Sequence, residues 1–368
     1  MQETTHQQIR GLLEQRITDA DLLKPYRPRC HDVGDLVRVR ATGVLPAREA
    51  EIGFRVLKQI GGGFAGQVYR VQLEELEGEA IDGLEVGKIY AVKVLVPPSR
   101  FSLMFRNLLY SMAFQGSFSA QVNPDAVRAG ALWQKLIRRG AALSLGSERA
   151  VVDIHATFHD EQLLSFGEIS EWVTGRVWRF AINDHVFRRL FTRSRDGAPD
   201  EGLGSVEYLR KKAFMRDLVR HFHTMGAPEL ARQYEWWTLK SQPNALKRMD
   251  GVTAGLDDLC AIDFRAGLAL LPFLPMAPGD IPLIIRGLLR GRLVQFDRGN
   301  LDVLDAYLVQ HEEHFTDYRP AVAELVKREA AYRGSLPDVT HHHVRLFKPE
   351  LRSSIRKGYI TAWRTLAL

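Results

Sequence analysis

A cluster of glycines between two β-prone segments constrains the fold more than any other feature of this sequence. The segment 61–68 reads GGGFAGQV and satisfies the pattern G-x-G-x-x-G-x-V. Glycines let backbone N–H groups approach phosphate oxygens, because a side chain at those positions would block the approach. A Rossmann dinucleotide fold requires a helix directly after such a loop, but residues 67–73 alternate like a strand. The cluster therefore predicts a phosphate-cradling turn between two strands.

Strand-like segments dominate the front half of the chain. Residues 54–60 and 67–73 flank the glycines, and residues 88–96 form a third strongly β-prone run. The order strand, turn, strand, loop, strand predicts a three-stranded antiparallel sheet. Residues 151–158 and 163–172 favour two more strands, and a short alternating stretch at 36–40 favours another.

The back half favours helices. Apolar spacing predicts helices over 124–139 and 206–225, and shorter ones over 7–24 and 186–191. The chain after 264 reads as helices with proline-rich joints. We therefore expect three parts: an N-terminal extension (1–52), a β-rich lobe (53–176) and a helix-rich lobe (177–368).

Three polar residues follow the glycine cluster in an informative order. Lys93 ends the sequence YAVK, close to the V-A-I-K signature, on the strand expected beside the glycine turn. Asp263 follows a hydrophobic strand and precedes Phe264, as in the D-F-G site that holds Mg²⁺. Asn244 stands nineteen residues before Asp263, just ahead of a short strand. Taken alone, Lys93 is a solvated strand lysine, but the ordered set favours a nucleotide site.

These motifs resemble the protein-kinase-like superfamily, and within it the UbiB-type atypical kinases. Residues 66–69 (GQVY) resemble the segment after that family's nucleotide loop, and 242–244 (QPN) resemble its H-P-G-N. The likeness extends over residues 54–310. It implies an α+β, bilobal protein-kinase-like fold, with an antiparallel β N-lobe and a mainly helical C-lobe.

The resemblance also implies a site with ATP and Mg²⁺ as cofactors. Asn244 and Asp263 would hold the metal, and Lys93 and Asp263 would be catalytic residues. The third candidate catalytic residue, Lys240, does not follow from the resemblance: it stands next to Leu239, where the family has an aspartate, and would stabilise the transferring phosphate instead. The nucleotide would contact the following positions: Gly61, Gly63, Phe64, Gly66, Val68, Ala91, Lys93, Glu171 and Val173.

The sequence departs from the family pattern at important positions. Leu239 stands five residues before Asn244, where kinases place the aspartate that orients or deprotonates the nucleophile, and leucine does neither. Arg265 replaces the glycine of D-F-G. For the glutamate partner of Lys93, the helix at 124–139 offers only Asp125 and Gln134 as substitutes.

Composition and charge indicate the compartment of the protein and the kinds of partner it attracts. The formal net charge of +6 is diffuse, which indicates mild attraction to anions rather than a nucleic-acid-binding tail. Two cysteines, Cys30 and Cys260, argue against a disulfide framework and favour the cytoplasm. We expect no membrane-spanning helix. The basic stretch 286–292 suggests peripheral contact with the inner face of an anionic membrane, although a helix on the lower lobe is the simpler interpretation.

Three functions compete for this chain. The first is an atypical kinase-like phosphotransferase that acts on a small-molecule or lipid-like acceptor, since phosphoryl transfer depends mostly on positioning and electrostatics. The second is a nucleotide-binding pseudokinase that serves a protein partner as scaffold or switch, which Leu239 and Arg265 favour. The third is a basic scaffold for RNA or membrane that binds no nucleotide, and it requires the ordered motifs to be coincidental. We favour the first slightly over the second.

Overall fold

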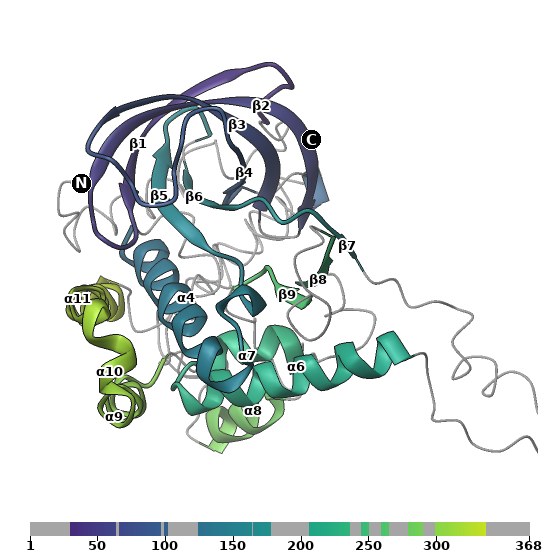
Figure 1. Cartoon of the computed structure of the whole chain (residues 1–368). Coiled ribbons are helices and arrows are strands. Elements are labelled where there is room, and N and C mark those ends of the chain that lie inside the picture. Colours follow the sequence, from purple (N-terminus) through teal and green to yellow (C-terminus); the bar gives the residue numbers. More distant parts are fainter. Residues whose placement is uncertain are drawn as a thin grey trace, which may run out of the picture.

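The structure is a computed structural model of the whole chain, and Figure 1 labels its helices and strands. It describes residues 30–63, 66–96, 99–101, 124–163, 165–177, 206–235, 244–249, 259–264, 279–289 and 299–335.

The front half forms a closed barrel of antiparallel strands (Figure 1). The strands are β1 (Leu36–Gly43), β2 (Glu49–Gly63), β3 (Gly66–Gly78), β4 (Ile89–Val94), β5 (Ile154–Asp160) and β6 (Ser165–Glu171). Their order around the barrel is β1-β2-β3-β4-β6-β5, and pairing between β1 and β5 closes it. Because β1 pairs with β5, neither of these strands is left as a sheet edge with unpaired backbone groups along the paired residues.

The barrel has its own apolar core, which follows from strict alternation along the strands. In β4, Tyr90, Val92 and Val94 are buried, while the residues between them lie on the outer face. Phe54 packs edge-on against Phe158 in the same interior, with ring centroids 6.0 Å apart. Burying each such side chain contributes about 2 kcal/mol to folding.

Helices and a small sheet form the rest of the described structure. The helices are α4 (Pro124–Ser144), η2 (Glu148–Ala150), α6 (Val206–Thr224), α7 (Pro228–Glu235), α8 (Asp280–Leu289), α9 (Leu301–Gln310), α10 (Glu312–Phe315), η5 (Thr316–Tyr318) and α11 (Arg319–Ser335). The sheet has the order β7 (Gly175–Val177), β8 (Ala245–Arg248), β9 (Leu259–Ala261). A second apolar core joins α4 to α6, α7, α9, α11 and this sheet, below the barrel in Figure 1.

Helix α4 connects the barrel to the helical part. Its Arg128 is 1% exposed and donates to both carboxylate oxygens of Glu324 on α11, at 2.7 and 2.9 Å. The same guanidinium donates to the carbonyl oxygens of Thr42 and Val44 at the end of β1. Trp133 of α4 donates through its indole N–H to Glu329 at 3.0 Å. These bonds hold both α11 and the barrel against α4.

The prediction of a bilobal protein-kinase-like fold is wrong. The strands close into a barrel, because β1 pairs with β2 on one side and with β5 on the other. We expected residues 1–52 to be an extension, but β1 lies in this range and belongs to the barrel. The boundary expected between residues 52 and 53 falls inside β2. Alternation identified β1 as a strand, but it carries no information on which strands a segment pairs with.

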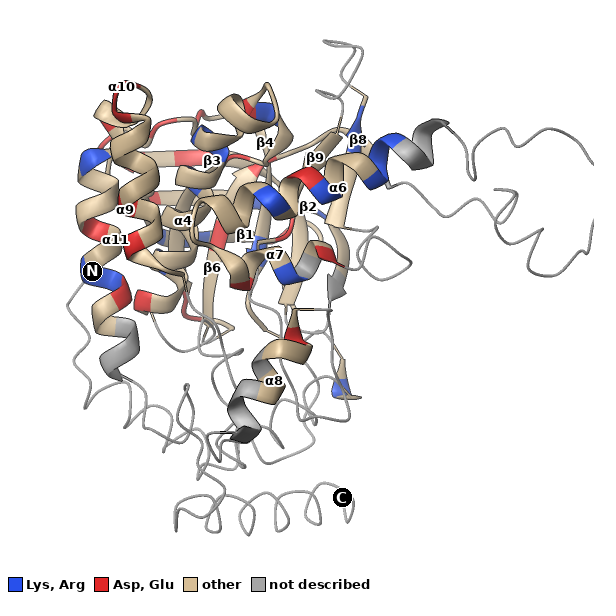
Figure 2. Ribbon diagram, turned by 90° about the horizontal axis from the view of Figure 1, so that it is seen from below, with Lys and Arg blue, Asp and Glu red and all other residues tan. Residues whose placement is uncertain are grey.

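Most individual elements agree with the sequence interpretation. The strands expected at 36–40, 54–60, 67–73, 88–96, 151–158 and 163–172 are β1 to β6, and the helices at 124–139 and 206–225 are α4 and α6. The helices expected at 7–24 and 186–191 lie outside the described residues. In the part of the chain that is described, no helix combines the length and apolarity needed to cross a membrane. Basic and acidic residues are interspersed on the helices, as Figure 2 shows.

Candidate functional site

Three of the residues predicted to contact the nucleotide, Gly61, Val68 and Lys93, lie in one row that crosses four strands of the barrel. Val68 of β3 lies opposite Gly61 of β2 and opposite Lys93 of β4, and Lys93 lies opposite Glu168 of β6. Directly opposed residues of antiparallel strands share one face. Because Tyr69 and its neighbours along the next row are buried in the core, this row lies on the outer face of the barrel.

The glycine hairpin, defined here as residues 61–63 and 66–68, has an irregular backbone. The β2–β3 register shifts between Gln59 and Gly61, as in a β-bulge, and Gly61 has a φ of +154°. Residues with a side chain rarely adopt this φ, so the bulge requires glycine. Nothing lies within 4 Å of the place where a Cβ of Gly61 would stand. Gly63 pairs with Gly66 at the end of the ladder, whereas Phe64 lies outside the described residues.

Lys93 and Asp263 meet across 170 positions of sequence. The Lys93 Nζ atom lies 2.6 Å from Oδ1 of Asp263, and the two side chains are 17% and 30% exposed. This contact joins the strand beside the glycine hairpin to the segment that follows β9. Two of the predicted site residues therefore lie together, and both remain partly accessible to solvent.

Tyr234, at the end of α7, fixes the backbone on which Asp263 stands. Its buried hydroxyl donates to the Asp263 carbonyl at 2.6 Å and accepts the Asp263 N–H at 3.1 Å. The Asn244 carbonyl lies 3.4 Å from the same hydroxyl and also accepts the Ile262 N–H at 2.9 Å. One tyrosine thus holds both segments that carry predicted metal ligands. The sequence analysis missed it, because nothing in the α7 pattern distinguishes Tyr234 from an ordinary core residue.

Tyr234 and the residue that follows Asp263 are both buried. Burial, followed by the nearby Asp263 carboxylate, raises the pKa of Tyr234 well above its usual value, so its hydroxyl stays protonated and able to donate. The next residue, Phe264, is 8% exposed and packs against the rings of Tyr234 and Phe222. Phe264 therefore points into the helical core, while Asp263 remains at the surface beside Lys93.

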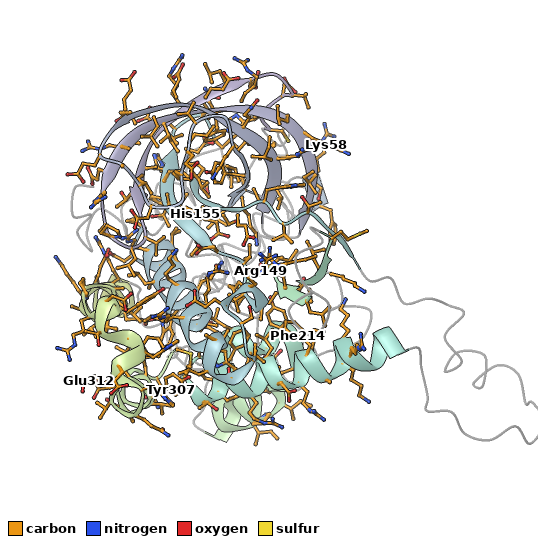
Figure 3. The ribbon with its side chains drawn as sticks, viewed as in Figure 1. Lys58, Arg149, His155, Phe214, Tyr307 and Glu312 are labelled. Carbon is orange, nitrogen blue, oxygen red and sulfur yellow. The ribbon has the colours of Figure 1, made fainter. Side chains whose placement is uncertain are left out.

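The residues predicted beside the nucleotide at the end of β6 have structural partners. Glu171 accepts two hydrogen bonds from Arg248 of β8, at 2.5 and 3.0 Å, and Val173 is buried in the helical core. Arg248 also donates to the Arg149 carbonyl, and Figure 3 shows Arg149 where the barrel meets the helical part. Burial acts to raise the pKa of Glu171, but the hydrogen bonds and charge of Arg248 outweigh it and lower this pKa.

Ala91, which the resemblance places beside the nucleotide, lies on the outer face of the barrel. It lies two positions before Lys93 on the same face of β4, about 7 Å away along the strand. In the ladder it stands between Arg70 of β3 and Ser170 of β6. The Arg70 guanidinium carbon lies 5.2 Å from the centre of the Trp172 ring, a cation–π contact. Along β3, Arg70 lies two positions beyond Val68, so this pair lies beside the row on the side away from the tip of the glycine hairpin.

The proposed substitutes for a glutamate partner of Lys93 have other partners. Asp125 pairs with Arg328 at 2.8 Å, and the Gln134 amide donates to the Val152 carbonyl at 3.0 Å. Asp263 takes the place at the Lys93 ammonium instead.

Several predicted residues lie outside the described part of the chain. They are Leu239, Lys240, Arg265, residues 242–243 and residues 290–292 of the basic stretch, whereas residues 286–289 of that stretch form the end of α8. Contact of that stretch with an anionic membrane therefore stays a prediction.

The donor set suits Mg²⁺ together with phosphate. Magnesium prefers oxygen ligands and usually takes only one or two carboxylates, with water and substrate phosphates completing its shell. Asp263 offers a carboxylate, and Asn244 offers an amide oxygen on the adjacent segment. No group of three or more His, Cys, Asp or Glu side chains able to hold a metal occurs among the residues that the structure describes.

A scan against models of protein families found no match, and a search of curated proteins found none either.

Proposed function

We propose that this protein binds a nucleoside triphosphate, with ATP as the leading candidate, together with Mg²⁺ on the outer face of its barrel. The observation that carries the proposal is the 2.6 Å contact between Lys93 and Asp263. It brings a cation on the strand beside the glycine hairpin to the carboxylate that the sequence predicts as a metal ligand. A lysine ammonium pairs with phosphate as a point charge.

The two groups are complementary to the two charges of a metal–nucleotide complex. Lys93 would pair with phosphate oxygens, Asp263 and Asn244 would hold the metal, and the N–H groups of the glycine hairpin would face the phosphates. Without ligand, Lys93 and Asp263 neutralise each other. Partial exposure keeps the free energy of this exchange of partners small, because exposed ion pairs contribute only about 0–1 kcal/mol.

Within this proposal, phosphoryl transfer to a small-molecule or lipid-like acceptor is the activity we favour. Bound Mg²⁺ would neutralise charge on the phosphates, and the chain would contribute position and electrostatics. Leu239, at the place where a loop aspartate is expected, favours the second candidate, a nucleotide-binding scaffold or switch that performs no transfer.

A binding titration tests the proposal. ATP with Mg²⁺ should raise the melting temperature of the protein, and the stabilisation should reach about 2.7 kcal/mol at a hundredfold excess over the dissociation constant. Lys93→Ala and Asp263→Asn should remove this effect. Lys88→Ala is the matched control, since Lys88 immediately precedes β4 and pairs only locally with Glu85. No stabilisation of the unaltered protein at millimolar ATP, or equal binding by all variants, would overturn the proposal.

A turnover measurement then separates the two candidates. Slow ATP hydrolysis by the unaltered protein that disappears in Asp263→Asn would favour the phosphotransferase. Binding that depends on Asp263 without any turnover, with or without acceptors, would favour the scaffold.

A further inference from the structure

A buried polar network lies inside the barrel, on the opposite face of the sheet from Lys93. His31, in the segment that leads into β1, is 3% exposed, and its Nε2 lies 2.6 Å from Oδ2 of Asp160 at the end of β5. Asp160 is 1% exposed, and its other oxygen accepts the Leu163 N–H at 2.9 Å. The side chain of His31 thus fixes the position of its own backbone against β5.

The network continues from that backbone to the glycine hairpin. The His31 N–H donates to the hydroxyl of Tyr69 at 3.1 Å, and this hydroxyl donates in turn to Oε1 of Gln67. Both Tyr69 and Gln67 are fully buried and point from β3 to the same side. Gln67 belongs to the hairpin itself, where it pairs with Gly62.

An apolar core alone does not require this arrangement. The neighbouring inward positions of the barrel are apolar, and burying polar groups costs free energy unless each finds a partner. Burial raises the pKa of Tyr69 to about 12, so the hydroxyl stays protonated and can donate its proton to Gln67. A satisfied buried network of this kind specifies one conformation for the groups it joins.

We propose that His31 and Tyr69 are positioning residues for the glycine hairpin, so that the segment preceding the barrel controls nucleotide affinity; the affinity part rests on the proposed function. A hairpin rich in glycine loses more backbone entropy on ligand binding than one with side chains. Ordering the hairpin in advance reduces that loss and tightens binding. The hydrogen bond from Tyr69 to Gln67 supplies this order from inside the barrel, while the phosphate-facing groups lie outside.

Tyr69→Phe tests the proposal, with Tyr90→Phe as the matched control. Both tyrosines lie in the barrel core on adjacent strands, and both hydroxyls make two hydrogen bonds. Those of Tyr90 go to Gly83 and Glu85, in the loop before β4 and not in the hairpin. Loss of the Tyr69 hydroxyl, with both of its hydrogen bonds, should speed amide hydrogen exchange of the hairpin about tenfold in the free protein. The dissociation constant for ATP with Mg²⁺ should rise about three- to tenfold. Tyr90→Phe should change neither.

Hydrogen exchange in the free protein keeps this proposal separate from the proposed function. Unchanged hairpin exchange in Tyr69→Phe, or equal changes in the two variants, would overturn the positioning role, whatever the nucleotide does. Faster hairpin exchange in a protein that binds no ATP would support the positioning role and overturn the proposed function together with the affinity control.

His31→Ala gives a second route if Tyr69→Phe folds poorly. It removes the contact with Asp160 and leaves the His31 backbone N–H in the chain. It should speed exchange in the same hairpin amides, and the double variant with Tyr69→Phe should show less than the product of the two single effects, because both changes interrupt one network. A full product of the two effects would contradict the network.

Discussion

The barrel meets the β8–β9 segments at two ion pairs of similar chemistry and different surroundings. Glu171 and Asp263 are almost equally exposed, at 29% and 30%, but their cations differ: Arg248 is 3% exposed and Lys93 is 17% exposed. Arg248 donates to both oxygens of Glu171, to the Arg149 carbonyl and to the Cys260 sulfur. Lys93 presents a single ammonium on a flexible stem.

The difference separates a structural junction from a site able to exchange partners. A planar guanidinium that is buried and bonded to two strands cannot leave without exposing unpaired groups. A partly exposed lysine can turn to another anion, such as a phosphate, at lower cost than a buried guanidinium. We infer that Glu171–Arg248 fixes the barrel on the small sheet, and that Lys93–Asp263 is the part available to a ligand.

Arg248→Met should give the largest effect. It removes a buried charge and leaves the Glu171 carboxylate and the Arg149 carbonyl without this donor. Breaking such a pair should lower the free energy of unfolding by about 3 kcal/mol, the low end of the range for buried pairs, because Glu171 keeps some contact with water. Urea denaturation measures the change.

Arg38→Met is the control for this prediction. Arg38 also bonds both oxygens of a glutamate, Glu75, with both bonds at 2.7 Å, but its side chain is 65% exposed. Its removal should leave the urea midpoint unchanged. Equal effects of the two arginine substitutions would show that burial does not distinguish the two kinds of pair.

Tyr234→Phe should give the next largest effect. It removes the hydroxyl that bonds the Asp263 N–H and carbonyl, so the free energy of unfolding should fall by about 2 kcal/mol. Because Asp263 then lies on a looser backbone, ATP with Mg²⁺ should also bind more weakly. Tyr307→Phe, on α9 in the same core, should leave nucleotide binding unchanged. Equal loss of binding in both variants would contradict a specific role for Tyr234.

Acid should weaken the Glu171 junction. Arg248 holds the folded-state pKa of Glu171 below its usual 4.5, against the opposing effect of burial. A carboxyl with a lowered folded-state pKa stabilises the protein above its unfolded-state pKa, and that contribution disappears as the pH falls through the folded-state value. Below pH 4.5, the unfolding free energy of the unaltered protein should therefore fall more steeply than that of Glu171→Gln. Urea denaturation at a series of pH values measures both slopes, and parallel slopes would contradict this assignment.

The candidate site shows what the sequence could and could not predict. The ordered motifs brought Lys93 and Asp263 together correctly, because each motif is local and each lies beside a strand that alternation identifies. The closure of the barrel by β1 was missed, since strand pairing is a long-range choice. The contact of Glu171 with Arg248 could not be predicted, because Arg248 lies 77 residues further along the chain. Tyr234 was missed for a similar reason: its function depends on a backbone that only the folded chain brings to it.

Lys93→Met should give the smallest effect on stability and the clearest one on function. Its ion pair with Asp263 is partly exposed, so the free energy of unfolding without ligand should change by less than about 1 kcal/mol. The methionine keeps the apolar stem and removes only the ammonium, so the stabilisation by ATP with Mg²⁺ should disappear. Urea denaturation with and without nucleotide measures both quantities on one protein. A large loss of stability without ligand would place Lys93–Asp263 in the same class as Glu171–Arg248, and the distinction between a structural junction and an exchangeable one would fail.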